Sequence, residues 1–325
     1  MTSQTMTAIQ LHSTGGPEVL QLNHLATPTA APGQVLAETI ATGVNFIETY
    51  QRSGIYPVPL PFTPGSEASG RVVAVGQGVT EFQPGDLIAT ASATGTYAQF
   101  FTAAAELCLL IPEGIDPVEA AALPLQGMTA HYLINSTYPV QAGETVLFHA
   151  GAGGVGGIAI QLLKAKGATV ITTVSNDEKE AIALAHGADH ALRYEGFAQK
   201  VHELTDGKGV AVAYDGVGKD TFTDSLKSLA IRGMGVLFGG ASGQVPPFNL
   251  QELNSLGSLF ITRPTLAHYS QNREEVTWRM GELFQAIQAG QLKLSIDQTF
   301  PLADAAQAHR YLEARKTRGK VLLVP

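Results

Sequence analysis

The sequence has little cysteine and no long apolar run. Cys108 is the only cysteine among 325 residues, so no disulfide can form within the chain and no four-cysteine zinc site can be built. No window approaches about 18 uninterrupted apolar residues, which argues against a membrane-spanning helix. The first residues show neither a basic start nor an apolar stretch, so they do not resemble a secretion signal. We therefore expect a cytoplasmic protein without membrane insertion.

Basic residues are also scarce. Lys and Arg number 20 against 28 Asp and Glu, which gives a net charge of −8, and no basic run is present. This balance argues against nucleic acid or an anionic membrane surface as the main partner. Hydrophobic residues make up 45% of the sequence, enough for full cores, and 325 residues correspond to about two domains.

A glycine-rich turn lies in a strand-turn-helix-strand setting. The run Thr145–Phe148 predicts a buried strand and leads directly into Gly151-x-Gly153-x-x-Gly156. The turn is followed by a helical pattern and then by a second strand, at Ile158–Lys166 and Thr169–Val174. In this setting the motif indicates a dinucleotide-binding site. The alternative is a βαβ unit whose glycines serve only packing.

Each residue of the turn has an expected role. Gly151 permits the tight turn, Gly153 lets the backbone approach a pyrophosphate, and Gly156 lets the helix pack close to its strand. The free N–H groups at the helix start, together with the positive end of its dipole, hold the phosphates. We therefore assign Gly154 and Val155 to the cofactor site with the three glycines.

The end of the second strand bears on the choice of cofactor. An acidic residue at this position binds the ribose hydroxyls of NAD. Here the strand ends in Ser175 and Asn176, whereas Asp177 and Glu178 come later and suit the start of a helix. Lys179 follows closely and could bind a 2′-phosphate, so we favour NADPH and assign Ser175 and Lys179 to the cofactor site. The alternative for Lys179 is an ordinary solvated helix lysine.

The pattern along the chain predicts an α/β protein with two domains. Residues 1–124 are mostly β, with strand-like runs at Val35–Ala41, Ser69–Val75 and Leu87–Thr90. Residues 125–265 alternate strand and helix, which indicates a doubly wound parallel sheet. The further elements expected there are helices at Glu178–His186 and Asp220–Ala230 and strands at Val210–Tyr214, Val236–Phe238 and Leu259–Thr262. The tail, 266–325, adds helices at Arg273–Ala289 and Leu302–Ala314 and a strand at Lys320–Val324.

Several phrases give the chain a family resemblance. They are Gly43–Tyr50, Arg52–Tyr56, Pro64–Gly70, Phe148–Gly156, Tyr214–Gly218 and Thr262–Pro264. Together they resemble the zinc-independent, zeta-crystallin-like quinone oxidoreductases of the medium-chain dehydrogenase/reductase family. The resemblance implies a GroES-like catalytic domain formed by 1–124 and 266–325, and a Rossmann domain formed by 125–265. It also implies NADPH as cofactor, a quinone substrate and a homodimer, for which Leu259–Thr262 is the candidate edge strand.

The resemblance also implies the site residues. Asn45, Tyr50 and Tyr56 correspond to positions that face the nicotinamide, with Tyr56 best placed as a hydroxyl donor. Further cofactor contacts correspond to Thr129, Tyr194, Phe238, Arg263 and Arg315. The alternatives are that the tyrosines only line the site and that the arginines form surface ion pairs. A serine that is common in the family is replaced here by Gly216.

No metal is expected. By the resemblance, Asn45 and Ser66 stand where zinc-dependent relatives have a cysteine and a histidine. His186 and His190 are four residues apart, but the intervening Gly187 breaks the helix that would align them. His149, at the end of a strand, is expected to be a packed or capping residue. The cofactor then supplies the hydride, and the protein supplies orientation.

Two alternative functions remain open. One is NADPH-dependent reduction of 2-alkenals or enones, which needs the same hydride and depends more on a proton donor. The other is a non-catalytic, nucleotide-binding or RNA-binding protein, as some zeta-crystallins also are. The net charge of −8 argues against RNA.

Overall fold

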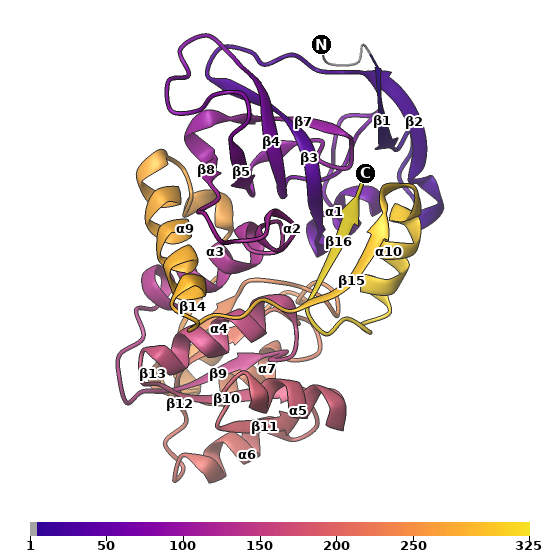
Figure 1. The fold of residues 1–325 in the computed structure, drawn as a ribbon. Coiled ribbons are helices and arrows are strands. Elements are labelled where there is room, and N and C mark those ends of the chain that lie inside the picture. The colour runs from indigo at the N-terminus through magenta and orange to yellow at the C-terminus, as the bar shows by residue number, and fades with distance from the viewer. Residues whose placement is uncertain (1–4) are drawn as a thin grey trace. The chain divides into compact units, whose positions relative to one another are not determined.

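The computed structural model describes residues 5–325 and divides into two compact units (Figure 1). Unit 1 contains the described residues through Gln126 together with Ser270–Gln288 and Leu294–Pro325. Unit 2 contains Gly127–Tyr269 and Ala289–Lys293. Within residues 5–325, no helix is both long enough and apolar enough to cross a membrane.

Unit 2 is built on a six-stranded sheet whose neighbouring strands are all parallel. The spatial order is β11-β10-β9-β12-β13-β14. The chain therefore moves outward from β9 to one edge and then restarts from β12 on the other side. This reversal between β9 and β12 is where doubly wound sheets bind ligands. The strands are β9 Thr145–His149, β10 Thr169–Val174, β11 His190–Arg193, β12 Val210–Asp215, β13 Leu229–Leu237 and β14 Phe260–Thr262.

Helices cover both faces of this sheet (Figure 1). The core includes Leu147 and Ile171 from the central strands and Phe197, Phe222 and Leu226 from two covering helices. The helices are α3 Pro124–Tyr132, which is followed by a π-helical turn, and α4 Gly154–Ala165, α5 Asp177–Ala185, α6 Phe197–Leu204, α7 Phe222–Lys227 and α8 Gln251–Ser255.

One predicted helix of this region is wrong at its ends, and four elements were not predicted. The helix expected over Asp220–Ala230 spans only Phe222–Lys227, and β13 already begins at Leu229. Gly233 and Gly235 interrupt the apolar pattern of β13, so only its last part was recognised as strand. The sequence pattern does not predict the helices α3, α6 and α8 or the strand β11.

Unit 1 is mainly antiparallel β, with a parallel pair at its edge. Its larger sheet has the order β15-β16-β3-β4-β5-β8, with β7 also paired to β3 and β6 to β7. A separate two-stranded sheet is formed by β1 and β2. The strands are β1 Thr5–Gln10, β2 Gln21–Ala26, β3 Gln34–Val44, β4 Ala68–Val75, β5 Leu87–Thr90, β6 Ala93–Thr94, β7 Phe100–Ala104, β8 Leu109–Leu110, β15 Ile296–Pro301 and β16 Lys320–Val324. The helices are α1 Phe46–Ser53, α2 Pro117–Ala120, α9 Arg273–Gln288 and α10 Ala305–Glu313.

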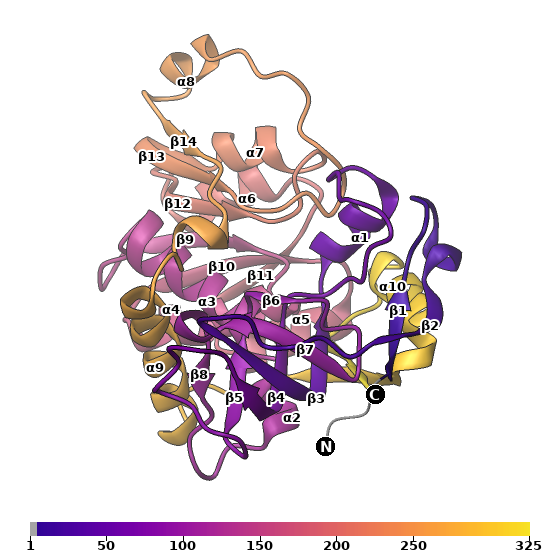
Figure 2. The same cartoon turned by 90° about the horizontal axis from the view of Figure 1, so that it is seen from above.

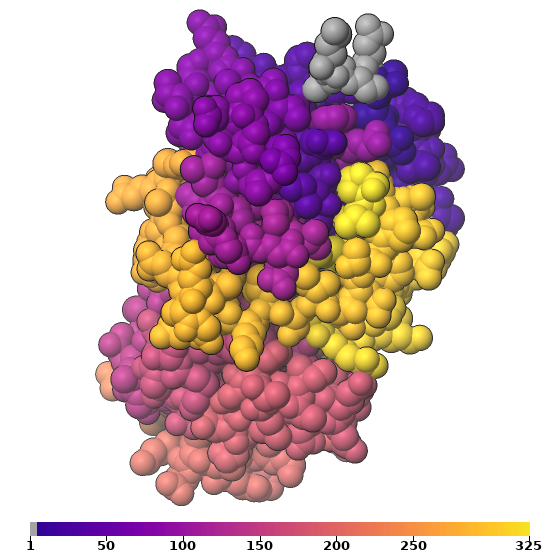
Figure 3. Space-filling view, viewed as in Figure 1, coloured from indigo at the N-terminus to yellow at the C-terminus, as the bar shows by residue number. Residues whose placement is uncertain are grey.

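The last strand of the chain closes onto one of the first. Strand β16 pairs antiparallel with β3, and Val321 lies opposite Val44. Figure 3 shows the C-terminal residues, in yellow, packed against the indigo N-terminal part of the same unit. This pairing brings Lys320 next to the end of β3, where α1 begins. The predicted fold class, an α/β protein with a doubly wound sheet and a β-rich GroES-like domain, is confirmed.

Two glycine-to-alanine variants test how tightly these elements pack. A Cβ on Gly156 would lie 2.3 Å from the carbonyl oxygen of Ala150, whereas a Cβ on Gly281, inside α9, would meet nothing within 4 Å. Gly156→Ala should therefore lower the free energy of unfolding by about 1–3 kcal/mol. Gly281→Ala should raise it by about 0.5–1 kcal/mol through helix propensity. Urea unfolding curves measure both changes, and a Gly156→Ala protein as stable as Gly281→Ala would contradict the close packing of the turn.

Candidate active site

The glycine turn of unit 2 connects β9 to α4 and leaves no room for side chains at two of its positions. A Cβ on Gly151 would lie 2.4 Å from Oγ1 of Thr172, and one on Gly156 would meet the backbone of Ala150. At Gly153 the nearest atom to an added Cβ is the oxygen of Ala150, 3.1 Å away. Helix α4 begins directly after Gly153, and the first N–H groups of a helix have no partner within it. The turn is thus suited to an anionic pyrophosphate.

A buried polar network links the strands at the point where the sheet order reverses. The carboxylate of Asp215 accepts hydrogen bonds from Oγ1 of Thr221 and from Oγ of Ser225, at 2.7 Å each, and from two backbone N–H groups of the following turn. The Ser225 hydroxyl also lies 2.9 Å from Nε2 of His149, whose Nδ1 lies 2.8 Å from Oγ1 of Thr173. Burial lowers the pKa of His149, so its ring is neutral. The expectation of a packed histidine is confirmed, since 1% of His149 is exposed.

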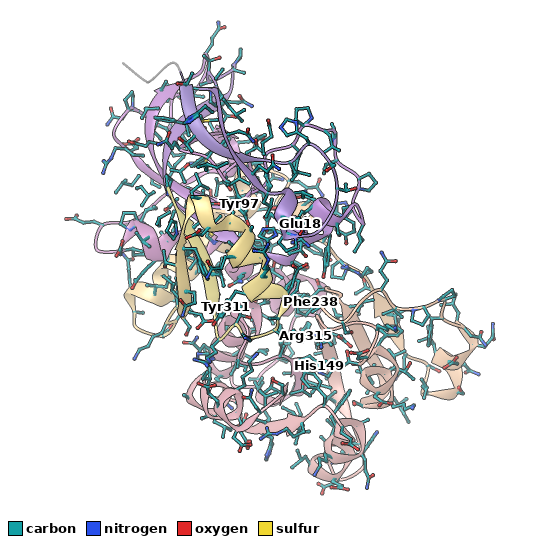
Figure 4. All side chains as sticks on the ribbon, turned by 90° about the vertical axis from the view of Figure 1, so that its right-hand side faces the viewer. Glu18, Tyr97, His149, Phe238, Tyr311 and Arg315 are labelled. Carbon is teal, nitrogen blue, oxygen red and sulfur yellow. The ribbon has the colours of Figure 1, made fainter. Side chains whose placement is uncertain are left out.

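Two predicted cofactor residues of unit 2 pack beside this network. The ring of Tyr194 stacks near His149, with centroids 6.3 Å apart, and that of Phe238 contacts Phe148, with centroids 5.6 Å apart. Figure 4 labels His149 and Phe238 in this unit. A Cβ on Gly216 would come within 2.8 Å of the Phe238 ring, so a serine could not stand there with Phe238 in this position.

The end of β10 places the residues that we predicted for a 2′-phosphate. Ser175 is exposed and Lys179 is half-buried in the first turn of α5, where its N–H donates to the side chain of Asn176 at 2.9 Å. Arg193, at the end of β11, lies opposite Val174. Its guanidinium forms ion pairs with carboxylates of the first turn of α5, Asp177 and Glu180. The sequence pattern does not predict β11, and it therefore gives no indication of Arg193.

The remaining predicted cofactor residues have varied surroundings. Thr129 is buried in α3 at 8% exposure. Arg263 is exposed, and its Nη1 donates to the backbone of Pro264 at 3.2 Å. Arg315, in unit 1, is exposed and follows α10 with a φ of 57°. Their roles toward a cofactor stay predictions.

In unit 1 the predicted catalytic residues gather around α1. Asn45 immediately precedes the helix, Tyr50 lies within it and Tyr56 follows it. The rings of Tyr50 and Tyr56 meet edge to face with centroids 5.4 Å apart, and the N–H of Tyr56 donates to the carbonyl of Tyr50 at 3.1 Å. Tyr56 is 39% exposed, whereas Asn45 is 5% exposed. The turn after α1 thus brings the two tyrosines together.

The amide of Asn45 joins a buried ion pair. Its Nδ2 donates to Oε2 of Glu67 at 2.9 Å, and its Oδ1 accepts from Nζ of Lys320 at 2.7 Å. The ammonium of Lys320 also donates to Glu67, and both charged residues are at most 1% exposed. A Cβ on Gly43 would lie 2.0 Å from Oε2 of Glu67, so a glycine is needed there. We did not predict Glu67 or Lys320, although a glutamate inside the phrase Pro64–Gly70 was a signal.

These residues do not fit a zinc ion. The oxygens of Asn45 and Glu67 that could bind a cation both accept hydrogen bonds from the ammonium of Lys320. A zinc site needs further nitrogen or sulfur ligands, and the neighbouring position is Ser66. Across residues 5–325, no group of three or more His, Cys, Asp or Glu side chains could hold a metal ion.

A second glutamate, Glu48, lies in the first turn of α1. Oε2 of Glu48 accepts from the N–H of Asn45 at 2.7 Å, whereas its Oε1 is buried without a hydrogen-bond partner in the described structure. Burial raises the pKa of Glu48 from 4.5 to about 8, the charge of Lys320 opposes this, and the charge of Glu67 adds to it. The carboxyl group is therefore mostly neutral at pH 7.

The end of α1 is held by a second buried network. The guanidinium of Arg52, 3% exposed, pairs with Glu313 at 2.7 Å and lies 3.1 Å from Nδ1 of His309. Because a guanidinium can only donate, Nδ1 accepts and Nε2 carries the proton that bonds to the Tyr97 hydroxyl, 3.1 Å away. Burial lowers the pKa of His309 to about 3, which agrees with this neutral ring. Tyr97 lies inside unit 1 (Figure 4).

The raised pKa of Glu48 predicts a pH-dependent stability. Between pH 4.5 and 8 the unfolded chain loses the Glu48 proton and the folded chain keeps it, so this residue destabilises the fold increasingly as the pH rises. The quantity to compare is the free energy of unfolding of the native protein minus that of the Glu48→Gln variant at the same pH. This difference should fall by about 2–3 kcal/mol from pH 5.5 to pH 8. Urea unfolding at both pH values measures this difference. Because His309 is present in both proteins, its titration contributes equally to both and cancels. A difference independent of pH would rule out a raised pKa.

The glycine turn on the parallel sheet of unit 2, together with the β-rich unit 1, indicates a dinucleotide-dependent oxidoreductase. Residues 31–137 match the model of the alcohol dehydrogenase GroES-like domain, and residues 154–278 match that of the zinc-binding dehydrogenases. Relatives include a quinone oxidoreductase of Pseudomonas aeruginosa, 46% identical over 98% of this chain and 99% of the relative. A 2-haloacrylate reductase of a Burkholderia species is 43% identical over 98% of both chains.

Solved structures agree with these matches. A mycobacterial protein in complex with NADPH is 49% identical, with a TM-score of 0.97 over 98% of this chain and 100% of the other. The Escherichia coli quinone oxidoreductase in complex with NADPH is 44% identical, with a TM-score of 0.96 over the same shares. The chain belongs to the quinone oxidoreductases of the medium-chain dehydrogenase/reductase family, as the resemblance predicted.

Proposed function

We propose that this chain reduces quinones with NADPH and without a metal ion. The observation that carries the proposal is its full-length similarity to quinone oxidoreductases, at 44–46% identity. NADPH supplies the hydride when it is bound, and the chain binds and orients the reactants. The proposed domain limits are 1–124 with 266–325 for catalysis and 125–265 for the cofactor. A cytoplasmic location is part of the proposal.

The residues of unit 2 are assigned to cofactor binding. The turn from Gly151 to Gly156, with the N–H groups at the start of α4, holds the pyrophosphate. Ser175 and Lys179 hold the 2′-phosphate, where no acidic side chain stands at the strand tip to repel it. The other assigned contacts are Thr129, Tyr194, Phe238, Arg263 and, from unit 1, Arg315.

The residues around α1 are assigned to the reacting groups. Asn45 orients the nicotinamide, and Tyr50 and Tyr56 line the quinone site. A quinone accepts a hydride readily, so orientation contributes more than acid catalysis. The hydroxyl of Tyr56, a residue that is 39% exposed, stabilises the developing charge on the quinone oxygen by a hydrogen bond.

A second candidate activity is reduction of an activated carbon–carbon double bond. The 2-haloacrylate reductase relative favours it, because it covers the same 98% of the chain at 43% identity. Hydride then goes to carbon, and a proton must reach the neighbouring carbon, which would make Tyr56 more important.

The chain is also proposed to form a homodimer through the edge of the sheet in unit 2. Strand β14 is the edge strand, and α8 lies nearby (Figure 2). Large apolar side chains of this region are exposed, with Ile231 at 78%, Phe260 at 57% and Leu250 at 64%. An edge strand with exposed apolar groups can be covered by pairing with a second copy.

The choice of NADPH over NADH is tested at Lys179. Lys179→Ala should weaken NADPH binding by about 1.5–3 kcal/mol, because a charge-assisted contact to the 2′-phosphate is lost. Binding of NADH should hardly change, and Lys200→Ala, an exposed lysine of α6, serves as the matched control. Fluorescence titration measures both affinities. Equal losses for the two cofactors would refute the assignment of Lys179.

Turnover with two substrates tests the activity and the role of Tyr56. With a metal chelator present, the native protein should oxidise NADPH with 1,4-benzoquinone. Tyr56→Phe should retain most of this turnover, since losing one neutral hydrogen bond costs about 0.5–1.5 kcal/mol. A drop of about a thousandfold, with unchanged NADPH affinity, would identify an obligate proton donor. It would also favour reduction of enones, which the same assay measures directly.

A further inference from the structure

We propose that Glu67 and Lys320 are positioning residues that fix the amide of Asn45 in a single orientation for the reaction. The inference rests on the proposed function, in which Asn45 lies beside the nicotinamide. Glu67 and Lys320 form a buried ion pair in unit 1, although they lie 253 positions apart in the sequence.

The two partners of the amide impose opposite requirements. Nδ2 of Asn45 donates to Glu67 at 2.9 Å, and Oδ1 accepts from Lys320 at 2.7 Å. A carboxylate can only accept hydrogen bonds, and an ammonium can only donate them. Rotating the amide by 180° would place its oxygen against the carboxylate and its NH₂ group against the ammonium. The pair therefore excludes the flipped amide and leaves the second N–H of the amide in a fixed direction.

The ion pair is itself held from several sides. Oε1 of Glu67 accepts from the backbone N–H of Leu125, at the start of α3, at 2.7 Å. Lys320 is the first residue of β16, which is paired to β3 beside it. The missing side chain of Gly43 provides the space for both groups, because an added Cβ would lie 2.8 Å from Cε of Lys320. Neither charged side chain can easily move away from Asn45.

Stability alone does not explain this arrangement. A buried ion pair must overcome a large desolvation cost, and well-packed apolar residues of similar volume are often as stable or more stable. The backbone of Asn45 is held separately, since its N–H donates to Glu48 at 2.7 Å. Removing the charges of Glu67 and Lys320 should therefore release the amide orientation while the start of α1 stays in place.

The test is a double-mutant cycle on kcat for 1,4-benzoquinone. The combined variant Glu67→Gln with Lys320→Met keeps similar volumes and leaves no unpaired buried charge. It should lower kcat roughly tenfold, with an NADPH affinity within about twofold of the native protein. In the Asn45→Ala background the same two changes should alter kcat less than about twofold, because there is no amide left to orient.

Other outcomes would overturn the proposal. An equal fold-reduction of kcat in the native and in the Asn45→Ala background would show that the ion pair acts only through the stability of the structure. An unchanged kcat in the combined variant, or in Asn45→Ala alone, would show that the orientation of the Asn45 amide does not affect turnover. If the combined variant does not fold, Glu67→Gln alone is carried through the same cycle, since a glutamine can bond to either orientation of the amide. Failure of the proposed function is distinct, because the native protein would then show no NADPH-dependent quinone turnover.

Discussion

The buried carboxylate of Glu67 connects three segments that are distant in the chain. It accepts hydrogen bonds from the side chain of Asn45, the backbone of Leu125 and the ammonium of Lys320. Through them it holds the start of α1, the start of α3 and the first residue of β16. The proposed catalytic residues all lie on or next to α1, and Glu67 contacts the side chain of one of them, Asn45.

Three buried carboxyl groups illustrate how surroundings decide charge. Glu67 is paired with an ammonium, whereas Asp215 is surrounded by neutral donors, two hydroxyls and two backbone N–H groups. Glu48 has one N–H donor and an unpartnered oxygen, and burial raises its pKa to about 8. Burial of a charge is tolerated where enough donors compensate for lost water, and otherwise the group keeps its proton.

The local parts of the structure could be predicted from the sequence. The glycine turn, β9 and β10 follow from patterns within about 30 residues, which is the length of one βαβ unit. The start of β13 inside an expected helix could not, because its apolar pattern is broken by Gly233 and Gly235. The ion pair of Glu67 and Lys320 lies beyond any local pattern, since it is created by the pairing of β16 with β3. The family resemblance predicted Asn45 as a site residue, but it did not point to the two groups that hydrogen-bond its amide.

The pairing of β16 with β3 also has a consequence for the order of folding during synthesis. Glu67 leaves the ribosome 253 residues before Lys320, a delay of roughly 10–50 s at typical rates of translation. Residues Gly127–Tyr269 of unit 2 are complete within that interval and can form their sheet first. The larger sheet of unit 1 instead cannot be completed until β16 has been synthesised and can pair with β3. The sheet of unit 2 can therefore form before the larger sheet of unit 1 is complete.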